Sequence, residues 1–344
     1  MNGQRRPGEE YRNVPVLVLG AAGFIGRWVA RSLEQGGADL NLAVRNRPSA
    51  EAVFDAYDIR GAVWEADLAN LQTVRELLRT VKPAVTFNLA GYGVDRSESD
   101  EQAADRINRE LVGAVCREIA GAADRKGWHG QQVVHAGSAL EYGALDGNLD
   151  ENADPQPSTL YGRTKLAGTK LLEEIAKARQ IRALTARLFT VYGPGEHGGR
   201  LLPSLLEAAR TCRPLELTAG VQRRDFTYVE DVAEGLLRLG AASARPGEVV
   251  NLATGRLTSV GAFARTAATI LGIPREGLKF SAIPLRPEEM EHSPVTVERL
   301  KRLTGWTPPT SLAEGIRQTL AFVSRAVGES VNGNSLNLRP RSFV

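Results

Sequence analysis

Short apolar segments that alternate with longer amphipathic ones constrain the fold more than any other feature of this chain. Apolar segments lie at Val14–Leu19, Asp39–Arg45, Ala62–Ala66, Ala84–Leu89, Gln132–Ala136 and Ala183–Leu188. Amphipathic segments lie at Ile25–Gln35, Leu71–Arg79, Glu101–Ala123 and from Tyr161 to Arg179. Strands that alternate with helices lie parallel in one sheet, with helices on both faces. We therefore predict an α/β fold with a doubly wound parallel sheet.

The second half of the chain is patterned less regularly. After Tyr192 the elements are shorter and Pro and Gly are more frequent, which indicates a smaller C-terminal α/β part that covers a substrate. We predict a main domain at residues 14–190 plus about 225–258, and the smaller part at 191–224 plus about 259–328. Residues 1–13 are predicted to be a disordered arm and residues 329–344 a loose tail, because both are polar.

Composition excludes several classes of protein. A hydrophobic content of 42%, a charged content of 24% and a net charge of +3 are typical of a soluble globular protein and give no basic stripe for nucleic acid. Neither Cys116 and Cys212 nor the histidines have metal-ligand spacing, so we expect no metal. No apolar run approaches the length of a membrane span, and the start has no apolar signal core. We expect a cytoplasmic protein without nucleic-acid or membrane partners.

A glycine-rich turn follows the first predicted strand. In Gly20-Ala21-Ala22-Gly23-Phe24-Ile25-Gly26 the spacing is GxxGxxG. Glycines allow a tight turn and a close approach of backbone to a diphosphate, and the helix that follows offers N–H donors and a positive dipole end. A purely structural turn is the alternative, but the position directly after the first strand of a βαβ pattern favours a nucleotide site. The predicted cofactor contacts are Gly20, Gly23, Phe24, Ile25 and Gly26.

The second strand ends in Ala43-Val44-Arg45-Asn46-Arg47, without the acid that holds a ribose 2′-hydroxyl in NAD sites. An arginine accommodates a 2′-phosphate, so Arg45 favours NADP over NAD, although a solvated turn arginine is the alternative. Later strand ends supply further candidate cofactor contacts at Asp67, Leu68, Leu89 and Ala90. Asp67 has the alternative role of capping the next helix.

Tyr161 and Lys165 lie four residues apart on a predicted helix and therefore project from one face. An ammonium beside a phenol favours the phenolate and lowers the pKa of the phenol from its usual value of about 10. Taken alone, the pair is also compatible with a solvated helix surface. Ser138 follows the strand that ends at Ala136, where open α/β sheets bind their ligands, and its hydroxyl can orient a reacting oxygen.

Together these motifs resemble the extended short-chain dehydrogenase/reductase family, which has a Rossmann fold. The resemblance rests on GxxGxxG, on Ser138 four residues before Tyr142-Gly143, and on YxxxK at Tyr161–Lys165. The segments 187–195 and 223–231 resemble the sugar-nucleotide branch of that family, and Gly305-Trp306-Thr307-Pro308 resembles its C-terminal ending. The resemblance implies an NAD(P)-binding main domain and a sugar-nucleotide-binding smaller part.

The same resemblance implies roles for individual residues. Ser138, Tyr161 and Lys165 would be catalytic, with Tyr161 as the acid or base and Lys165 also bound to the nicotinamide ribose. Asn108 resembles the structural asparagine of the family, although Leu111 replaces the glycine that usually follows. The implied substrate-binding residues are Tyr92, Ser138, Thr190, Arg224 and Arg286, with Thr190 at a position where many relatives carry Asn. The helices around 101–123 and 159–179 would pair in a homodimer.

Three activities of the family compete. In 4,6-dehydratases an acidic pair follows the catalytic serine or threonine, whereas Ala139 and Leu140 follow Ser138 here, so dehydration is not favoured. A 4-epimerase retains its cofactor and generally uses NAD, whereas a 4-ketoreductase most often consumes NADPH. Arg45 therefore favours an NADPH-dependent reductase of a nucleotide-linked 4-keto-6-deoxyhexose, with an NAD-dependent 4-epimerase as the alternative. A non-catalytic dinucleotide-binding protein is a third possibility, against which Tyr161 and Lys165 count.

Overall fold

The computed structural model describes residues 8–94, 98–122, 127–143, 145, 147–285 and 291–332, with the backbone alone from 326. The chain forms two compact units. The first consists of Met1–Phe189, Glu230–Gly255 and Ser293–Pro308, and the second of Thr190–Val229, Arg256–His292 and Pro309–Val344. Arg286 lies outside the described residues.

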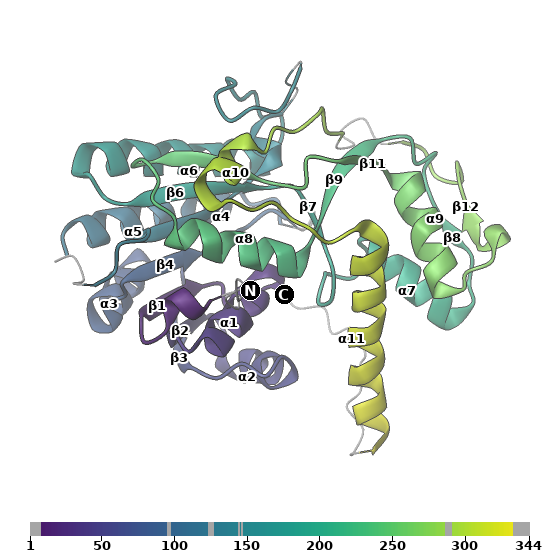
Figure 1. Cartoon of the computed structure of the whole chain (residues 1–344), viewed down its shortest axis with the longest axis horizontal. Helices are drawn as coiled ribbons and strands as arrows, with labels where there is room; N and C mark the ends of the chain where they lie inside the picture. Colours follow the sequence, from purple (N-terminus) through teal and green to yellow (C-terminus); the bar gives the residue numbers. More distant parts are fainter. Residues whose placement is uncertain are drawn as a thin grey trace, which may run out of the picture. The chain divides into compact units, whose positions relative to one another are not determined.

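A seven-stranded parallel sheet forms the centre of the first unit, which confirms the predicted fold class (Figure 1). Its strand order is β10-β6-β5-β4-β1-β2-β3. The strands are β1 (Pro15–Leu19), β2 (Asp39–Val44), β3 (Ala62–Glu65), β4 (Val85–Asn88), β5 (Val133–Ser138), β6 (Ala183–Leu188) and β10 (Glu248–Leu252). Because β1 pairs with both β2 and β4, the order of the strands reverses between β1 and β4, and such a switch point opens a crevice at the carboxyl ends of the strands.

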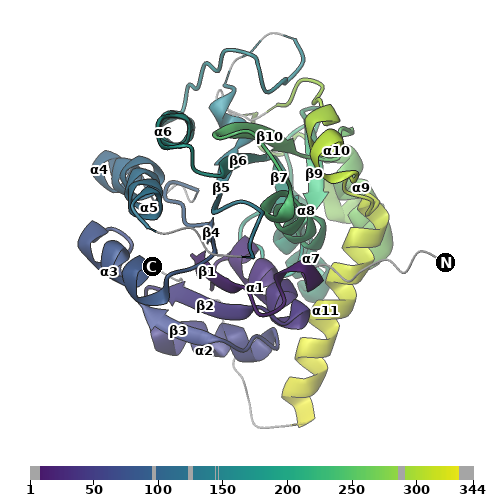
Figure 2. The same ribbon diagram turned by 60° about the vertical axis from the view of Figure 1, so that its left-hand side comes forward.

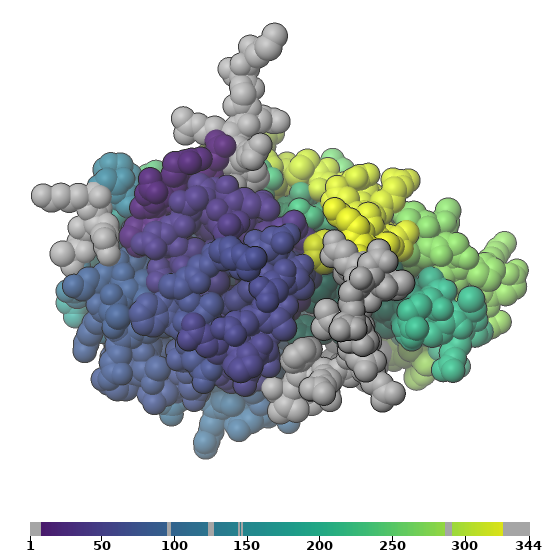
Figure 3. All heavy atoms as spheres, turned by 90° about the horizontal axis from the view of Figure 1, so that it is seen from below, coloured from purple at the N-terminus to yellow at the C-terminus, as the bar shows by residue number. Residues whose placement is uncertain are grey.

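Helices cover both faces of this sheet (Figure 2). Apolar side chains of α3 (Leu71–Val81), α5 (Leu111–Ala120) and α6 (Leu160–Arg179) pack with β1, β5 and β6 in one core on the first face. The other face carries α1 (Phe24–Gly36) and α8 (Val229–Ala241), while α2 (Arg47–Ala56) follows β2. Seen from below, the purple and blue atoms of the N-terminal part of this unit form one continuous surface (Figure 3).

Several predicted boundaries change. Helix α2 was not predicted from the sequence. The predicted helix over 101–123 consists of α4 (Glu101–Asp105), a π-helical turn η2 (Arg106–Glu110) and α5. The disordered arm is wrong for residues 8–13, which include the turn η1 (Glu9–Tyr11), because the Tyr11 ring is fully buried and its hydroxyl donates to the Leu237 carbonyl at 2.6 Å. The predicted tail begins too early, because helix α11 (Leu312–Asn332) continues through residues 329–332.

The second unit is built around a three-stranded sheet of order β11-β9-β7. Its strands are β7 (Thr190–Tyr192), β9 (Arg223–Tyr228) and β11 (Leu257–Ser259), and a two-stranded sheet joins β8 (Leu215–Glu216) to β12 (Leu278–Lys279). The helical elements are α7 (Leu201–Thr211), α9 (Val260–Leu271), the turn η4 (Arg275–Gly277) and α11. Aromatic rings of Tyr192, Phe226 and Phe263 pack against one another in its core.

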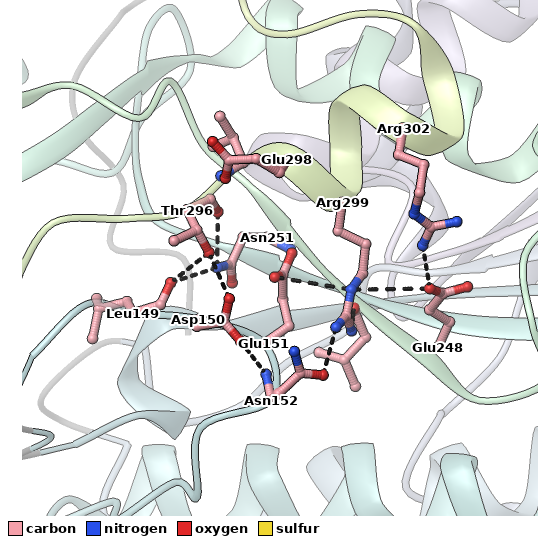
Figure 4. Close-up of polar contacts among 12 residues, drawn as sticks. Leu149, Asp150, Glu151, Asn152, Glu248, Asn251, Thr296, Glu298, Arg299 and Arg302 are labelled. Carbon is pink, nitrogen blue, oxygen red and sulfur yellow. Dashed lines mark hydrogen bonds and ion pairs between the residues drawn. The ribbon is translucent and has the colours of Figure 1, made fainter.

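Residues 293–308, which the sequence places in the smaller part, belong to the first unit. They contain α10 (Glu298–Thr304), and Figure 4 shows the contacts that hold them. Arg299 donates to the Val249 carbonyl at 2.8 Å, and Arg302 pairs with the buried Glu248 at 2.6 Å. The Asn251 amide donates to the carbonyls of Leu149 and Thr296, at 2.9 and 3.2 Å. Segments far apart in the sequence are thereby held to β10.

Candidate active site

The predicted cofactor residues gather where the parallel strands of the first unit end. Gly20 follows β1 with a φ of +78°, and an added Cβ would lie 3.0 Å from the Ala90 backbone nitrogen after β4. An added Cβ at Gly26 would collide with the Gly20 carbonyl oxygen. A side chain would therefore be strained at Gly20, because of its positive φ, and would collide at Gly26. Gly23 is the N-cap of α1 and provides no side-chain hydrogen bond to its first turn, which leaves that helix end suited to a diphosphate.

Arg27 braces this turn, a role that the sequence analysis missed. Its guanidinium donates to the Gly23 and Ala22 carbonyls at 3.1 and 2.9 Å, and it lies 5.1 Å from the centre of the Tyr57 ring. These hydrogen bonds could not be predicted from the sequence, because they depend on the path that the backbone takes through the turn. The braced turn, the glycine cradle and the uncapped helix end together fit a dinucleotide.

Arg45 is exposed and directly follows β2, whose last residue is Val44. Arg47, at the first position of α2, pairs with Glu51 at 2.9 Å. Asp67 lies two residues after β3. It does not cap the next helix, α3, because Asn70 is the N-cap of that helix. The Asp67 carboxylate instead accepts from the Ala69 backbone N–H at 3.0 Å. Leu68 follows Asp67, and Leu89 and Ala90 follow β4, all three partly buried.

Ser138 is the last residue of β5 and also the N-cap of the short turn η3 (Ala139–Glu141). Its Oγ accepts from the Leu140 backbone at 3.2 Å, and the Glu141 carboxylate accepts from the Ser138 backbone N–H at 2.8 Å. Two reciprocal bonds of this kind form a capping box, which fixes the start of a helical turn. Ser138 is 9% exposed, so its hydroxyl is held at the carboxyl end of the sheet in a largely buried position.

Helix α6 carries Tyr161 and Lys165 in its first two turns. Thr159 caps it by accepting from the Gly162 N–H at 3.0 Å, and an added Cβ at Gly162 would collide with the Leu140 carbonyl. The helix therefore packs closely against the turn that follows Ser138. The Tyr161 ring is partly buried and lies 3.4 Å from the position of an added Cβ at Gly93, in the segment after β4. Tyr161, Lys165 and the turn after Ser138 are thus assembled at the same sheet edge.

Lys165 is 2% exposed. Burial lowers the pKa of its ammonium from 10.5 to about 8, and the negative charge of Glu141 opposes that shift. The buried His135 on β5 has a pKa well below its usual value, because of burial first and of the Lys165 charge second. His135 is therefore neutral, and the Lys165 ammonium is held where it titrates close to physiological pH.

Asn108 sits in the π-helical turn η2, where an extra residue interrupts the regular helix. Its amide donates to the Tyr92 carbonyl at 2.8 Å and to the Thr164 hydroxyl at 2.9 Å, and it accepts from the Tyr92 N–H at 3.1 Å. Asn108 thereby ties the segment after β4 to helix α6. Its partner on that helix, Thr164, directly precedes Lys165 in the sequence.

A buried polar network lies behind Ser138, and the sequence analysis assigned no role to its members. The second carboxylate oxygen of Glu141 accepts from the Arg187 guanidinium at 2.9 Å; the two side chains are 0% and 3% exposed. Arg187 lies 4.4 Å from the centre of the Tyr142 ring, and the Tyr142 hydroxyl donates to Asn251 at 2.7 Å. These residues come from η3, β6 and β10, so only the fold brings them together.

Two of the predicted substrate residues lie in the second unit. Thr190 is buried and is the first residue of β7, and Arg224 lies on β9, opposite Thr258 of β11. Ser138, Tyr161, Lys165 and Tyr92 all belong to the first unit. Arg286, the remaining substrate candidate, is among the residues not described.

In the described part of the chain, no group of three or more His, Cys, Asp and Glu side chains is arranged to hold a metal ion. None of the helices in that part has the length and apolar character that a membrane crossing requires.

Comparison with known proteins places this geometry in a family. The profile of the NAD dependent epimerase/dehydratase family matches residues 16–253. The chain is 32% identical over 326 residues to dTDP-6-deoxy-L-talose 4-dehydrogenase (NAD(P)(+)) from Kitasatospora kifunensis, covering 90% of this chain and 96% of that protein. It is 30% identical to UDP-glucose 4-epimerase from Mycolicibacterium smegmatis, covering 89% and 97%.

A solved structure is similar over the same length. MoeE5 in complex with UDP-glucose and NAD has a TM-score of 0.76 and 28% identity, with 91% of this chain and 99% of that chain covered. The UDP-glucuronic acid 4-epimerase from Bacillus cereus, with a TM-score of 0.78 and 23% identity over 90% and 99% of the two chains, has the same fold. The match to the family profile, the relatives and the glycine cradle agree: this chain belongs to the NAD-dependent epimerase/dehydratase family, whose members act on sugar nucleotides.

Proposed function

We propose that this protein reduces the 4-keto group of a nucleotide-linked 4-keto-6-deoxyhexose with NADPH. The observation that carries the choice of a reductase is Arg45, which directly follows β2 in place of an acid. The relative from Kitasatospora kifunensis supports the choice, because its name describes a dehydrogenase for position 4 of a 6-deoxyhexose with NAD(P)+. Removal of hydrogen at that position is the reverse of the reduction proposed here.

In the proposed chemistry the bound cofactor supplies the hydride, and side chains of this chain handle the proton. Tyr161 donates its phenolic proton to the oxygen that forms at carbon 4. Lys165, charged at neutral pH, stabilises the phenolate left behind. The Ser138 Oγ already accepts from Leu140, so its hydrogen remains available to donate to the same substrate oxygen and orient it.

Dehydration does not fit the residues that follow Ser138. Elimination of water needs an acid and a base near the sugar ring. Ala139 and Leu140 occupy the positions where the dehydratases of the family carry their acidic pair, and the next carboxylate, Glu141, is fully buried and paired with Arg187. The proposed reaction is therefore reduction by hydride transfer, without elimination of water.

The proposed preference for NADPH is tested at Arg45. Arg45→Ala should weaken binding of NADPH at least about tenfold and leave binding of NADH within about twofold, because a charge-assisted contact to phosphate contributes about 1.5–3 kcal/mol. Fluorescence titration of the reduced cofactors measures both. Arg47→Ala is the matched control, since it removes another exposed arginine two residues further along the chain. An unchanged ratio of the two affinities in Arg45→Ala contradicts the assignment.

For the sugar nucleotide, we propose Tyr92 and Ser138 in the first unit and Thr190, Arg224 and Arg286 as further contacts. Arginine forks suit the oxygens of a diphosphate, which supports Arg224 and Arg286. We also propose a homodimer in which the helices around residues 101–123 (α4, η2 and α5) and 159–179 (α6) pair with their copies. The molar mass measured by light scattering on the eluting protein tests this part separately.

The whole proposal is tested by turnover. The protein is incubated with NADPH and a panel of nucleotide-linked 4-keto-6-deoxyhexoses, and the absorbance of NADPH is followed. Oxidation of NADPH, with a 6-deoxyhexose as the product, is the expected result. A 4-epimerase is the second candidate, supported by the relative from Mycolicibacterium smegmatis. No oxidation of NADPH, combined with interconversion of UDP-sugars without added cofactor, would establish the epimerase instead.

A further inference from the structure

Glu141 is a buried carboxylate that the proposed chemistry does not use. Its carboxylate accepts from the Ser138 backbone N–H at 2.8 Å and from the Arg187 guanidinium at 2.9 Å, and its charge also acts on the Lys165 ammonium. A fully buried carboxylate is costly unless charges and hydrogen bonds compensate it. A hydrophobic side chain at this position would complete a core without that cost. The presence of a charged side chain at position 141 therefore suggests a role in the neighbouring active site.

We propose that Glu141 is a positioning residue of the active site: it fixes the backbone of Ser138 and keeps the Lys165 side chain charged. The proposal rests on the proposed function, because it assigns Glu141 a role in the proton chemistry of Tyr161 and Lys165. It adds that this chemistry depends on a carboxylate outside the Ser138–Tyr161–Lys165 group.

The first part of the role is geometric. The Glu141 Oε1 accepts from the Ser138 N–H at 2.8 Å and lies directly over Gly137, where an added Cβ would come within 2.6 Å of it. The other oxygen, Oε2, is held by the Arg187 Nε at 2.9 Å. A carboxylate anchored at both oxygens allows Ser138 one backbone position. The Ser138 hydroxyl is thereby fixed at the end of β5.

The second part of the role is electrostatic. Arg187 and Lys165 are both almost fully buried, and Glu141 is the carboxylate that compensates both. An arginine keeps its proton in a protein, whereas a buried lysine loses its proton readily. If the carboxylate lost its charge, Lys165 would therefore be the group that becomes neutral.

Other titratable groups around Lys165 do not take over this role. His135 on β5 has a pKa well below its usual value because of burial and is neutral. Tyr142, after η3, has a raised pKa because of burial and is also neutral. Arg187 on β6 has the same charge as Lys165, and Tyr161 on the same helix is the proposed proton donor. The charge of Glu141 is what opposes deprotonation of Lys165.

The test is the pH profile of kcat/KM for NADPH-dependent reduction in Glu141→Gln. With Lys165 titrating at about 8, wild-type activity should fall above that pH, because Tyr161 is then no longer assisted by a cation. In Glu141→Gln this fall should move about 1–3 pH units toward acid, the range for loss of a nearby opposite charge. Loss of packing alone would lower the rate at every pH and leave the midpoint of the fall in place.

Glu248→Gln is the matched control. Glu248 is also buried and paired with an arginine, Arg302, but it is the first residue of β10, whereas Ser138 is the last residue of β5. In Glu248→Gln the alkaline fall in kcat/KM should have the same midpoint pH as in wild type. An unshifted midpoint in Glu141→Gln, or an equal shift in Glu248→Gln, would overturn the proposal.

A second readout needs no substrate and separates this proposal from the proposed function. The phenolate of Tyr161 is followed by ultraviolet difference absorbance between each protein and its Tyr161→Phe version. In Glu141→Gln the phenolate should form at higher pH than in wild type, even if no reductase activity is found. If Glu141→Gln does not fold, Arg187→Met removes the cation that competes for the carboxylate and should move the pH midpoint toward alkali. An unchanged or more acidic midpoint in that variant also contradicts the proposal.

Discussion

Replacing Tyr161 with phenylalanine is expected to lower kcat by about 10²–10⁴-fold, the usual contribution of a positioned general acid. The ring contact near Gly93 is made by carbon atoms and is retained by phenylalanine, so the fold should be unchanged. Only the hydroxyl is lost, and with it the proton for the new alcohol. Turnover is measured with NADPH and the 4-keto-6-deoxyhexose substrate, and cofactor binding by fluorescence titration, which should stay within about twofold because no hydrogen bond to the diphosphate is removed.

Tyr11→Phe controls for loss of a tyrosine hydroxyl. Tyr11 is buried in the first unit, and its hydroxyl donates to the Leu237 carbonyl of α8. Its variant should lose about 1 kcal/mol of stability, the usual value for a hydrogen bond, and keep its activity. If Tyr161→Phe retains more than about a tenth of wild-type turnover, a general-acid role for Tyr161 is wrong.

The alternation of strands and helices made the parallel sheet predictable, because that pattern is set by the period of the apolar residues. The same pattern placed Gly20, Arg45, Leu89 and Ser138 at or directly after strand ends, where the structure has them. Helix α2 was missed because it is short and buries only Ala50 and Phe54. The burial of Tyr11 was not predicted, because its neighbours in the sequence are polar. The Leu237 carbonyl that its hydroxyl contacts is 226 residues away.

The buried network shows where sequence reasoning ends. Glu141 and Arg187 each stand in a recognisable motif, but they are 46 residues apart and meet only because β5 and β6 are adjacent in the sheet. The π-helical turn at Asn108 is also invisible in sequence, since the residues of η2 are compatible with an ordinary helix. Motif spacing thus located the reacting groups, whereas their charge compensation depends on tertiary contacts.

Replacing Lys165 with methionine is expected to stabilise the fold while it removes activity. Burial lowers the pKa of the Lys165 ammonium from 10.5 to about 8, so the folded state holds this charge at a cost. At about 1.4 kcal/mol for each pKa unit, that cost is roughly 3 kcal/mol at pH 7. Methionine is of similar length and carries no charge, and Glu141 keeps its pairing with Arg187.

The pH dependence of the free energy of unfolding tests whether the buried charge of Lys165 causes the higher stability of Lys165→Met. Between about pH 8 and 10.5 the unfolded chain binds a proton at Lys165 that the folded chain does not, so wild-type stability rises with pH in that window. Below it both states carry the proton, and the full cost is present. The advantage of Lys165→Met in the free energy of unfolding, measured with urea, should therefore be largest at pH 7 and decline as the pH rises through the window.

Lys170→Met is the matched control, because Lys170 is an exposed residue of the same helix. Exposed substitutions usually change stability by less than about 0.5 kcal/mol, and this one should also leave the pH dependence and turnover unchanged. A Lys165→Met protein that is less stable than wild type at pH 7 would show that the buried ammonium is not a cost. A variant that is more stable yet inactive would show instead that the fold accepts a destabilising charge at the place where Tyr161 needs it.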